Sequence, residues 1–204
     1  MKVFEIFPSI QGEGPYQGIP SAFIRLSGCN LRCRWCDTPK TQDGSSGEEM
    51  TVDEVFGQVK KLGLSHVCIT GGEPLIQQDE LLSLLRDLHE DGYIVEIETN
   101  GTIDPVPVME YSSVCMDVKC PSSGEKSFAP FVKKLRPSDC VKFVVEGKED
   151  LEYMAGLLDD IPSYVEVCVS PVWGSDSRFI ADYIMKLKRP VRFQLQLHKI
   201  LSVS

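Results

Sequence analysis

Apolar runs and amphipathic stretches alternate along most of the chain. The amphipathic stretches carry apolar residues at helical spacing and predict helices over 52–62, 81–88, 151–158 and 179–187. Thr51 and Glu54 match a capping box at the start of the first helix. The apolar runs are short and rich in Val, Ile, Phe and Leu, which is typical of strands. They cover residues 21–28, 66–70, 93–98, 113–119, 140–146, 164–170 and 191–197.

This alternation predicts an α/β fold, because strands that alternate with helices pair in parallel through right-handed crossovers. The segments between residues 98 and 113 and after residue 119 show little helical pattern, so some crossovers are expected to be short or irregular. We therefore predict a partial, TIM-like barrel of about six parallel strands with reduced helical cover. A length of 204 residues without a linker-like tract predicts a single domain over 1–204.

The charge balance narrows the possible partners. Lys and Arg number 21 against 30 Asp and Glu, so the chain has no overall positive field for a phosphate backbone or an anionic membrane. We expect no nucleic-acid partner and no membrane association. The N-terminal sequence lacks the features of a signal peptide, and no apolar run is long enough to span a bilayer. These observations predict a cytoplasmic protein.

Polar and glycine-rich motifs follow most of the predicted strands. The carboxyl ends of parallel strands meet at one rim, where such sheets bind ligands. We therefore expect these motifs to share one site. They are Gly28 and Cys29, Gly71 to Pro74, Thr99 to Thr102, Lys119, Ser170 and His198.

Eight cysteines occur in the chain, and a chain of this size without an export signal is expected to keep them free or metal-bound. Four lie inside β-rich runs, where cysteine behaves as a small buried hydrophobe. These four are Cys68, Cys115, Cys140 and Cys168. Cys120, beside a proline at a strand end, is left open.

The other three cysteines form the motif CNLRCRWC, in which Cys29, Cys33 and Cys36 have the spacing CxxxCxxC. This spacing suits a zinc site or an iron–sulfur cluster. A structural zinc ion needs four ligands, and the next candidates, His66 and Cys68, lie in or beside a predicted buried strand. The cluster is therefore favoured. Three thiolates on a four-iron cluster leave one iron open to a small molecule.

The motif CNLRCRWC and the sequence Gly71-Gly72-Glu73-Pro74 resemble the cluster loop and the GGEP motif of the radical S-adenosylmethionine (SAM) superfamily. The resemblance implies a [4Fe–4S] cluster, SAM chelated at the open iron, a 5′-deoxyadenosyl radical and an external one-electron donor of the flavodoxin or ferredoxin type. It also implies a SAM pocket at the rim. The expected SAM-binding residues are Gly71, Gly72, Glu73, Glu98, Thr99, Asn100, Lys119 and Ser170.

Three further stretches resemble the 7-carboxy-7-deazaguanine synthase family: FEIFPSIQGEGPYQGIPSAFIRLSGCN, CDT after Cys36, and the tail QLQLHKILSVS. This resemblance implies a lyase that converts 6-carboxy-5,6,7,8-tetrahydropterin to 7-carboxy-7-deazaguanine with release of ammonia, in the biosynthesis of queuosine or archaeosine. It further implies a homodimer and a Mg²⁺ ion held partly by Thr38. The terminal segments 1–20 and 190–204 are expected to contribute to the substrate pocket.

The resemblance assigns substrate contacts to Gln11, Glu13, Arg25, His198 and the terminal carboxylate of Ser204. Gln11 and Glu13 offer an amide and a carboxylate that suit the donor and acceptor edge of a pterin. Arg25 supplies a cationic fork, and strand alternation favours its pointing inward. Asp37 either orients the waters of Mg²⁺ or caps its loop. No residue stands out as the proton donor for ammonia.

Two alternatives remain at this point. A glycyl-radical activating enzyme shares the cluster and SAM, but it predicts an open docking groove and has no need of the QGEG sequence. A non-catalytic iron–sulfur or zinc module predicts a fourth protein ligand and no affinity for SAM. The sequence leaves open the electron donor, the dimer interface, the end product of the pathway and the strictness of the Mg²⁺ requirement.

Overall fold

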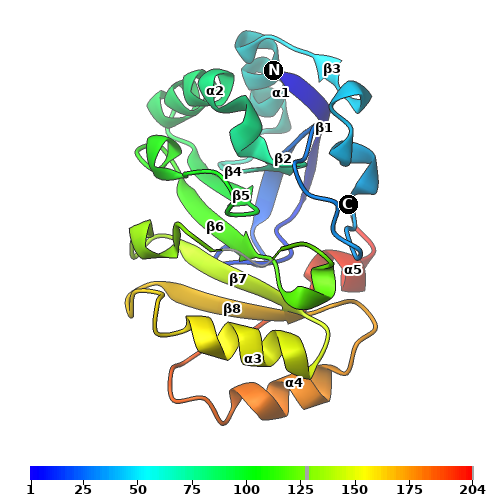
Figure 1. Cartoon of the computed structure of the whole chain (residues 1–204). Coiled ribbons are helices and arrows are strands. Elements are labelled where there is room, and N and C mark those ends of the chain that lie inside the picture. Colours follow the sequence, from blue (N-terminus) through cyan, green and yellow to red (C-terminus); the bar gives the residue numbers. More distant parts are fainter. Residues whose placement is uncertain (127–128, 204) are drawn as a thin grey trace.

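A single curved sheet dominates the computed structural model, which describes residues 1–126 and 129–203 (Figure 1). In this described part the strand order is β3-β1-β2-β4-β5-β6-β7-β8-β9. The strands from β2 onward pair in parallel, whereas β1 pairs antiparallel with both β2 and β3. The strands are β1 (Lys2–Ile10), β2 (Pro20–Leu26), β3 (Glu48–Glu49), β4 (His66–Gly71), β5 (Ile94–Thr99), β6 (Ser113–Val118), β7 (Cys140–Val145), β8 (Glu166–Pro171) and β9 (Arg192–Phe193).

The helical cover is incomplete, as the sequence predicts. The helices are α1 (Val52–Leu62), α2 (Gln78–Glu90), α3 (Lys148–Leu157), α4 (Ser177–Ile184) and α5 (Leu197–Leu201). In the described residues, the connections from β5 to β6 and from β6 to β7 hold only short 3₁₀ turns, at Val106–Val108, Pro121–Ser123 and Val132–Lys134. The predicted α/β fold, an open partial barrel, is confirmed.

Helix α1 shows how local sequence sets an element's bounds. Thr51 Oγ1 accepts a hydrogen bond from Glu54 N, and the Glu54 side chain accepts one from Thr51 N, so the predicted capping box is present. Gly63 ends the helix in the left-handed conformation that glycine tolerates best. Val55 and Val59 are fully buried, which places the predicted apolar face against the sheet.

The two faces of the sheet differ in chemistry. The convex face is apolar and packs under the helices, with Ile69, Ile97, Met116 and Phe143 fully buried. Alternate residues of the same strands point to the concave side. There the strands carry charged and thiol side chains, namely Arg25, Cys68, Glu96, Glu98, Cys115, Asp117, Cys140 and Lys142. The hydrophobic core is therefore the layer between sheet and helices, and the concave side is available for a site.

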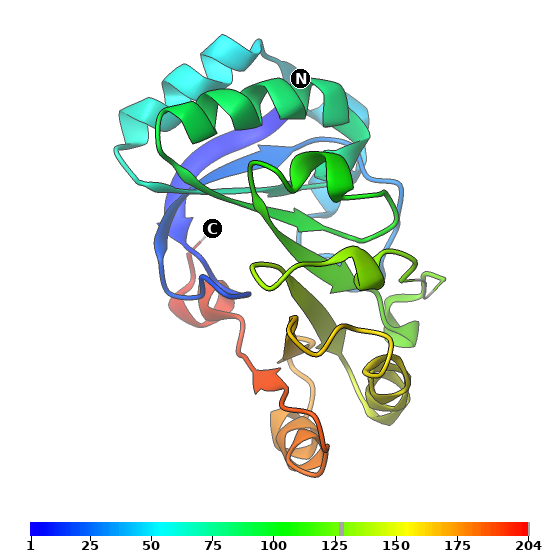
Figure 2. The same cartoon turned by 90° about the vertical axis from the view of Figure 1, so that its left-hand side faces the viewer.

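Two elements differ from the sequence prediction. Residues 2–10 form β1, which was not predicted, and the predicted strand 191–197 is wrong beyond Phe193. Gln194 donates to Gly14 O and accepts from Gly14 N, at 2.8 and 2.9 Å, so the chain leaves the sheet and pairs with the loop after β1. Figure 2 shows the C-terminal segment beside this loop, across the open side of the barrel.

Within the described ranges, the structure contains no helix with the length and apolar character needed to cross a membrane.

Candidate active site

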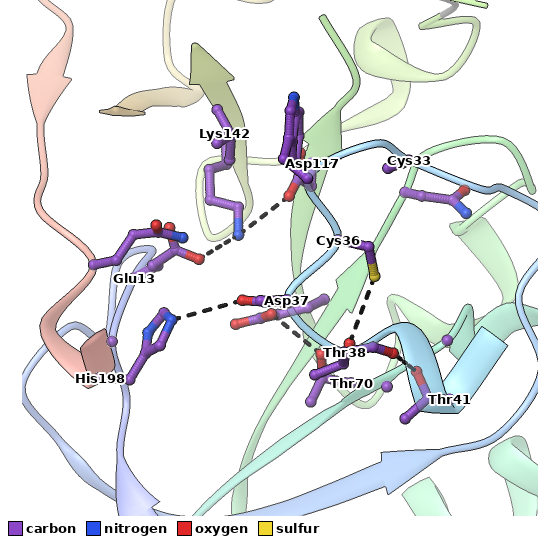
Figure 3. A pocket seen from close by; sticks show the side chains of 18 of the residues that line it. Glu13, Cys33, Cys36, Asp37, Thr38, Thr41, Thr70, Asp117, Lys142 and His198 are labelled. Carbon is purple, nitrogen blue, oxygen red and sulfur yellow. Dashed lines mark hydrogen bonds and ion pairs between the residues drawn. The ribbon is translucent and has the colours of Figure 1, made fainter. Parts of the chain in front are cut away.

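A pocket opens on the concave side of the sheet, at the carboxyl ends of the parallel strands. The strand residues Arg25, Thr70, Glu98, Asp117 and Lys142 line its walls. The loop after β1, the loop after β2 and helix α5 close the other sides. Figure 3 shows side chains from these segments pointing toward one another in one space. The sequence motifs that are far apart along the chain therefore meet in one pocket.

The glycine turn after β4 packs on the start of the cysteine loop. Gly72 N donates to Leu26 O at 2.9 Å, and Glu73 N donates to Gly28 O at 2.8 Å. A Cβ atom on Gly72 would lie 2.0 Å from Gly28 O, so only glycine permits this approach. Gly71 and Gly72 line the pocket. The turn thus fixes the start of the cysteine loop and exposes its own backbone to the pocket.

Glu73 lies beneath the pocket wall, not in it. Its side chain is fully buried, and its carboxylate accepts hydrogen bonds from Thr99 Oγ1 at 2.8 Å, Asn100 N at 2.7 Å and Leu75 N at 3.1 Å. Both carboxylate oxygens are therefore used within the fold. Glu73 ties the end of β4 to the end of β5, while Thr99 and Asn100 themselves line the pocket.

Cys29, Cys33 and Cys36 are half-buried and line the pocket. In residues 1–126 and 129–203, only one group of three metal-ligating side chains has all its ligand atoms within 4.8 Å of one another. That group does not consist of the three loop cysteines. At least two of the three sulfur atoms are thus farther apart than 4.8 Å. Thiolates on one tetrahedral zinc ion lie about 3.8 Å apart. The wider spacing fits a cluster that takes one thiolate at each of three irons.

The two other zinc-ligand candidates lie away from this loop. His66 lies at the start of β4, and its Nδ1 atom is 2.7 Å from Ser21 Oγ. The imidazole ring of His66 packs on the Tyr16 ring, with the ring centroids 4.4 Å apart. Burial lowers the pKa of His66 to about 4, so the ring is neutral. Cys68 faces Gln11 on the concave side of β4. Neither residue completes a site with the three loop cysteines.

Lys119 places a cation beside the cysteine loop. Its Nζ atom is 3.0 Å from Asp117 Oδ2 and 5.3 Å from the centroid of the Trp35 ring. Burial raises the pKa of the Cys33 thiol to about 11, and the charge of Lys119 counteracts that rise. An ionised thiolate is the form that binds a metal. Lys119 faces the pocket, and its charge favours the ionised form of the Cys29 and Cys33 thiols.

The expected SAM contacts at the remaining strand ends divide into two groups. Glu98 and Asn100 line the pocket, and the Asn100 amide donates to Asn30 Oδ1 at 2.9 Å. Ser170 is fully buried behind the wall, and its hydroxyl has no hydrogen-bond partner in the described part of the chain. Glu98 and Asn100 are therefore in place for a ligand, while Ser170 is not among the lining residues.

Glu13 reaches the pocket from the loop after β1. Its carboxylate is almost fully buried, with Oε2 at 2.7 Å from Lys142 Nζ. Lys142 lies on β7 and is also 3.3 Å from Asp117 Oδ2. Glu13 Oε1 and Asp117 Oδ1 are buried without a hydrogen-bond partner in the described chain. Figure 3 shows Lys142 between the two carboxylates.

Gln11 lines the pocket but its amide group points into the fold. Nε2 is 2.6 Å from Glu96 Oε2, 3.1 Å from Glu98 Oε1 and 3.3 Å from Cys68 Sγ. Burial, and then the charge of Glu98, raises the pKa of Glu96 to about 8. Glu96 is therefore a carboxylic acid at neutral pH. Gln11 supports the floor of the pocket and positions Glu13, whose backbone N–H faces Gln11 Oε1 at 3.4 Å.

Arg25 points into the pocket together with Phe23, as strand alternation predicts. Its Nε atom is 2.9 Å from Glu5 Oε1, and its guanidinium lies 5.2 Å from the centroid of the Phe7 ring. Both partners come from β1. The unpredicted strand β1 thus holds the one arginine of the pocket wall in place.

The segment after Cys36 brings Thr38 and Asp37 into the pocket. Thr38 Oγ1 is 3.9 Å from Cys36 Sγ. Asp37 Oδ2 is 3.7 Å from His198 Nε2 and 3.9 Å from Lys199 Nζ, as Figure 3 shows for His198. His198 belongs to helix α5 and not to a strand end, which corrects its predicted placement. The predicted contact of Ser204 lies outside the described residues.

Sequence reasoning missed several residues of the pocket. Asp117 and Lys142 lie inside runs that were predicted only as buried strands, and Thr70 immediately precedes the glycine turn. A charged residue within an otherwise apolar strand was the available signal for Asp117 and Lys142, because such a side chain is expensive to bury without a partner. Cys120 proves to be fully buried at the strand end.

Comparison with known proteins agrees with this geometry. The family model of the radical SAM superfamily matches residues 23–115. A 7-carboxy-7-deazaguanine synthase of Methanospirillum hungatei is 47% identical over 203 residues, covering 100% of this chain and 86% of the relative. The synthase of Thermoplasma acidophilum is 41% identical, covering 98% and 97% of the two chains. The chain belongs to the 7-carboxy-7-deazaguanine synthase family of radical SAM enzymes.

Solved structures place the fold in the same group. The crystal structure of QueE from Escherichia coli has a TM-score of 0.76 and 25% identity, covering 96% of this chain and 93% of that one. Streptococcus suis SuiB bound to SAM has a TM-score of 0.57 at 16% identity and covers 82% of this chain, a likeness of fold alone. Family membership makes the chain a radical SAM lyase that acts on a small molecule and uses a [4Fe–4S] cluster, SAM and Mg²⁺. The glycyl-radical alternative is not favoured.

Proposed function

We propose that this pocket converts 6-carboxy-5,6,7,8-tetrahydropterin to 7-carboxy-7-deazaguanine and ammonia. The observation that carries the proposal is the meeting of three motifs in one space: the cysteine loop, the GGEP turn and the loop that holds Gln11 and Glu13. When bound, the cluster and SAM supply the radical chemistry. The chain supplies binding, orientation and exclusion of water.

The cofactor side of the pocket is formed by the loop cysteines, the glycine turn and the strand ends beside them. Cys29, Cys33 and Cys36 would hold the cluster. Gly71, Gly72, Glu98, Thr99, Asn100 and Lys119 would contact SAM, with Glu73 supporting them from beneath; the expected contact of Ser170 would need a movement of its buried side chain. The support for this assignment is that the glycine backbone and the Lys119 cation lie next to the cysteine loop.

The substrate side is formed by Glu13, Arg25 and His198, with Gln11 behind Glu13. Glu13 Oε1 is a buried acceptor without a partner in the described chain, which suits the amino and ring N–H groups of a pterin. Arg25 would bind a carbonyl or carboxylate. Thr38 would contribute one oxygen to Mg²⁺, which usually keeps waters and takes substrate oxygens as well.

The domain organisation is proposed from the hydrogen bonds between the two terminal segments. We propose a single domain over 1–204 whose terminal segments 1–20 and 190–204 contribute to the pocket, supported by the Gln194 to Gly14 hydrogen bonds.

The electron comes from an external donor of the flavodoxin or ferredoxin type, since the five cysteines outside the loop are buried. A homodimer is proposed because several apolar side chains, including Trp173 and Leu201, remain exposed. Eight free thiols suit the reducing cytoplasm.

The test is a turnover assay. The chain is reconstituted anaerobically with iron and sulfide and given SAM, dithionite, Mg²⁺ and 6-carboxy-5,6,7,8-tetrahydropterin, and products are followed by mass spectrometry with an ammonia assay. We expect 7-carboxy-7-deazaguanine and ammonia in equal amounts. Cys33→Ala, which removes one cluster ligand, is the control and should form neither cluster nor product. An intact, reducible cluster that yields no product in the wild type would reject the proposed reaction.

A further inference from the structure

Lys142 is the most deeply buried cation of the pocket. Its side chain is 4% exposed, and it lies on β7 between two strands that are themselves buried on both faces. Burying an ammonium group is costly unless opposite charges compensate for the lost water. The compensation here comes from Glu13 Oε2 at 2.7 Å and Asp117 Oδ2 at 3.3 Å. The arrangement points to a purpose beyond packing, because apolar residues often replace buried ion pairs at no cost in stability.

The distribution of hydrogen bonds around Lys142 shows that purpose. Lys142 takes one oxygen of each carboxylate and leaves Glu13 Oε1 and Asp117 Oδ1 buried without partners in the described residues. A buried acceptor without a partner costs free energy until a donor reaches it. Glu13 lines the pocket, so a donor on the bound molecule can reach it. Lys142 therefore fixes which oxygen of Glu13 is left for the ligand.

The charges continue toward the cofactor side. Asp117 also pairs with Lys119 Nζ at 3.0 Å, and Lys119 lies beside Trp35 of the cysteine loop. The side chains of Glu13, Lys142, Asp117 and Lys119 thus form a row of alternating sign across the pocket. The row connects the loop after β1 with the cysteine loop.

Resting on the function proposed above, we propose that Lys142 is a positioning residue for substrate recognition. It binds Oε2 of Glu13 and so holds that side chain in one rotamer, which leaves Oε1 to accept hydrogen bonds from the N–H groups of the pterin. Lys142 acts through Glu13 and does not itself touch the reacting atoms. No motif identifies this residue, because it lies inside a strand and away from the sequences that mark the family.

The proposal explains why a lysine serves at this position. Although burial lowers the pKa of Lys142, the charges of Glu13 and Asp117 raise it well above the usual value, so the ammonium persists at any working pH. That ammonium donates the charge-assisted hydrogen bond that fixes Glu13 Oε2. Glu98, Cys115, Glu96, Asp37 and the cation of Lys119 also interact electrostatically with Lys142.

The test compares variants by pterin KM, by direct pterin binding to the SAM-loaded protein, and by iron content. In Lys142→Met we expect the pterin KM and Kd to rise about 10- to 100-fold, because a charge-assisted hydrogen bond contributes about 1.5–3 kcal/mol. The KM for SAM and the iron content should stay within about twofold of wild type. Lys60→Met, an exposed lysine of α1, is the matched control.

Further variants separate positioning from a structural role. Lys142→Arg keeps the cation and should recover most of the affinity. Glu13→Gln and the double variant Glu13→Gln/Lys142→Met should have equal pterin KM values, since Lys142 acts only through Glu13. The double variant also removes one charge of each sign, which keeps the test valid if Lys142→Met alone does not fold.

Any of three results would overturn the proposal. An unchanged pterin KM in Lys142→Met would do so, as would additive effects in the double variant or equal losses for pterin and SAM. Wild-type protein without pterin turnover would instead reject the proposed function itself. A product-forming wild type with an unaffected Lys142→Met variant would reject only the role of Lys142.

Discussion

Glu96 and Glu98 stand on the same strand and face the same side of the sheet, close enough for one amide to reach both. Gln11 Nε2 donates to Glu96 Oε2 at 2.6 Å and to Glu98 Oε1 at 3.1 Å. Two carboxylates in such a place cannot both be ionised without a large penalty. The pair therefore keeps a proton, and the raised pKa of Glu96, about 8, identifies where it resides. Glu96 is therefore uncharged at neutral pH although it is an acid.

Glu96→Gln tests this proton. The pKa of Glu96 is about 8 in the folded chain and near 4.5 when unfolded, so between those values folding takes up a proton. Stability from this group is thus present at low pH and is lost as the pH rises to 8, by up to about 1.4 kcal/mol per pH unit. We expect Glu96→Gln to gain stability relative to wild type between pH 5.5 and 8.5, measured by thermal unfolding. Glu110→Gln, at an exposed site, is the control. Identical pH slopes for wild type and Glu96→Gln would contradict the assignment.

The residues of the pocket differ in how far sequence alone could identify them. Cys33, Gly72 and Glu13 belong to short motifs, and the structure brings all three to one pocket or its edge. Lys142 and Asp117 could not be assigned, because a charged residue in a strand faces the pocket or the solvent according to the register and the curvature of the sheet. Glu73 matches a motif, yet only the coordinates show that its carboxylate is already used.

At the scale of elements, the C-terminal helix α5 is held by the loop after β1. Leu197 N donates to Gly12 O at 3.2 Å, and Gln17 Nε2 donates to the same oxygen at 3.0 Å. His198 then lies directly over Gly12, where a Cβ atom would be 2.2 Å from His198 Nδ1. The absence of a side chain at residue 12 therefore lets the helix place His198 in the pocket.

Gly12→Ala should displace His198 and the start of α5. We expect the pterin KM to rise about 10-fold, corresponding to about 1.4 kcal/mol of lost binding. The unfolding temperature should change little, because α5 is short and contains no fully buried residue. Gly57→Ala is the matched control, since a Cβ atom there meets nothing within 4 Å and alanine favours the helix by up to about 1 kcal/mol. A wild-type pterin KM in Gly12→Ala would show that His198 does not contribute to binding.

Elements with strong periodicity were predictable and those set by long-range pairing were not. The apolar stripe that includes Val55 and Val59 gave the bounds of α1 correctly. Residues 191–197 alternate as a strand does, but the side chain of Gln194 bonds to Gly14 and the chain leaves the sheet after Phe193. Strand β1 was missed because its partners, β2 and β3, are what make it a strand. Local pattern cannot report such partners.

At the scale of the whole molecule, the fold sorts the eight cysteines into two environments. Five are fully buried: Cys68, Cys115, Cys120, Cys140 and Cys168. The three loop cysteines are half-buried in the pocket wall. The thiols that would hold a cluster are thus the accessible ones, although no cysteine of this chain is fully exposed. A thiol reagent in solution should therefore react with the three loop cysteines and not with the five buried ones.

Labelling of the metal-free chain with a small thiol reagent should modify three cysteines in the native state and eight after unfolding in guanidinium. The reaction should be slow at pH 7 and accelerate toward pH 9, because burial raises the pKa of Cys33 to about 11 and that of Cys29 as well, and only the thiolate reacts. Cluster loading should protect all three, and mass spectrometry of peptides identifies the sites. Cys120→Ser controls for labelling of a buried thiol and should leave the native count at three. A fourth thiol that reacts as fast as the loop set, or loop thiols that stay reactive after loading, would contradict the division of roles on which the cluster assignment depends.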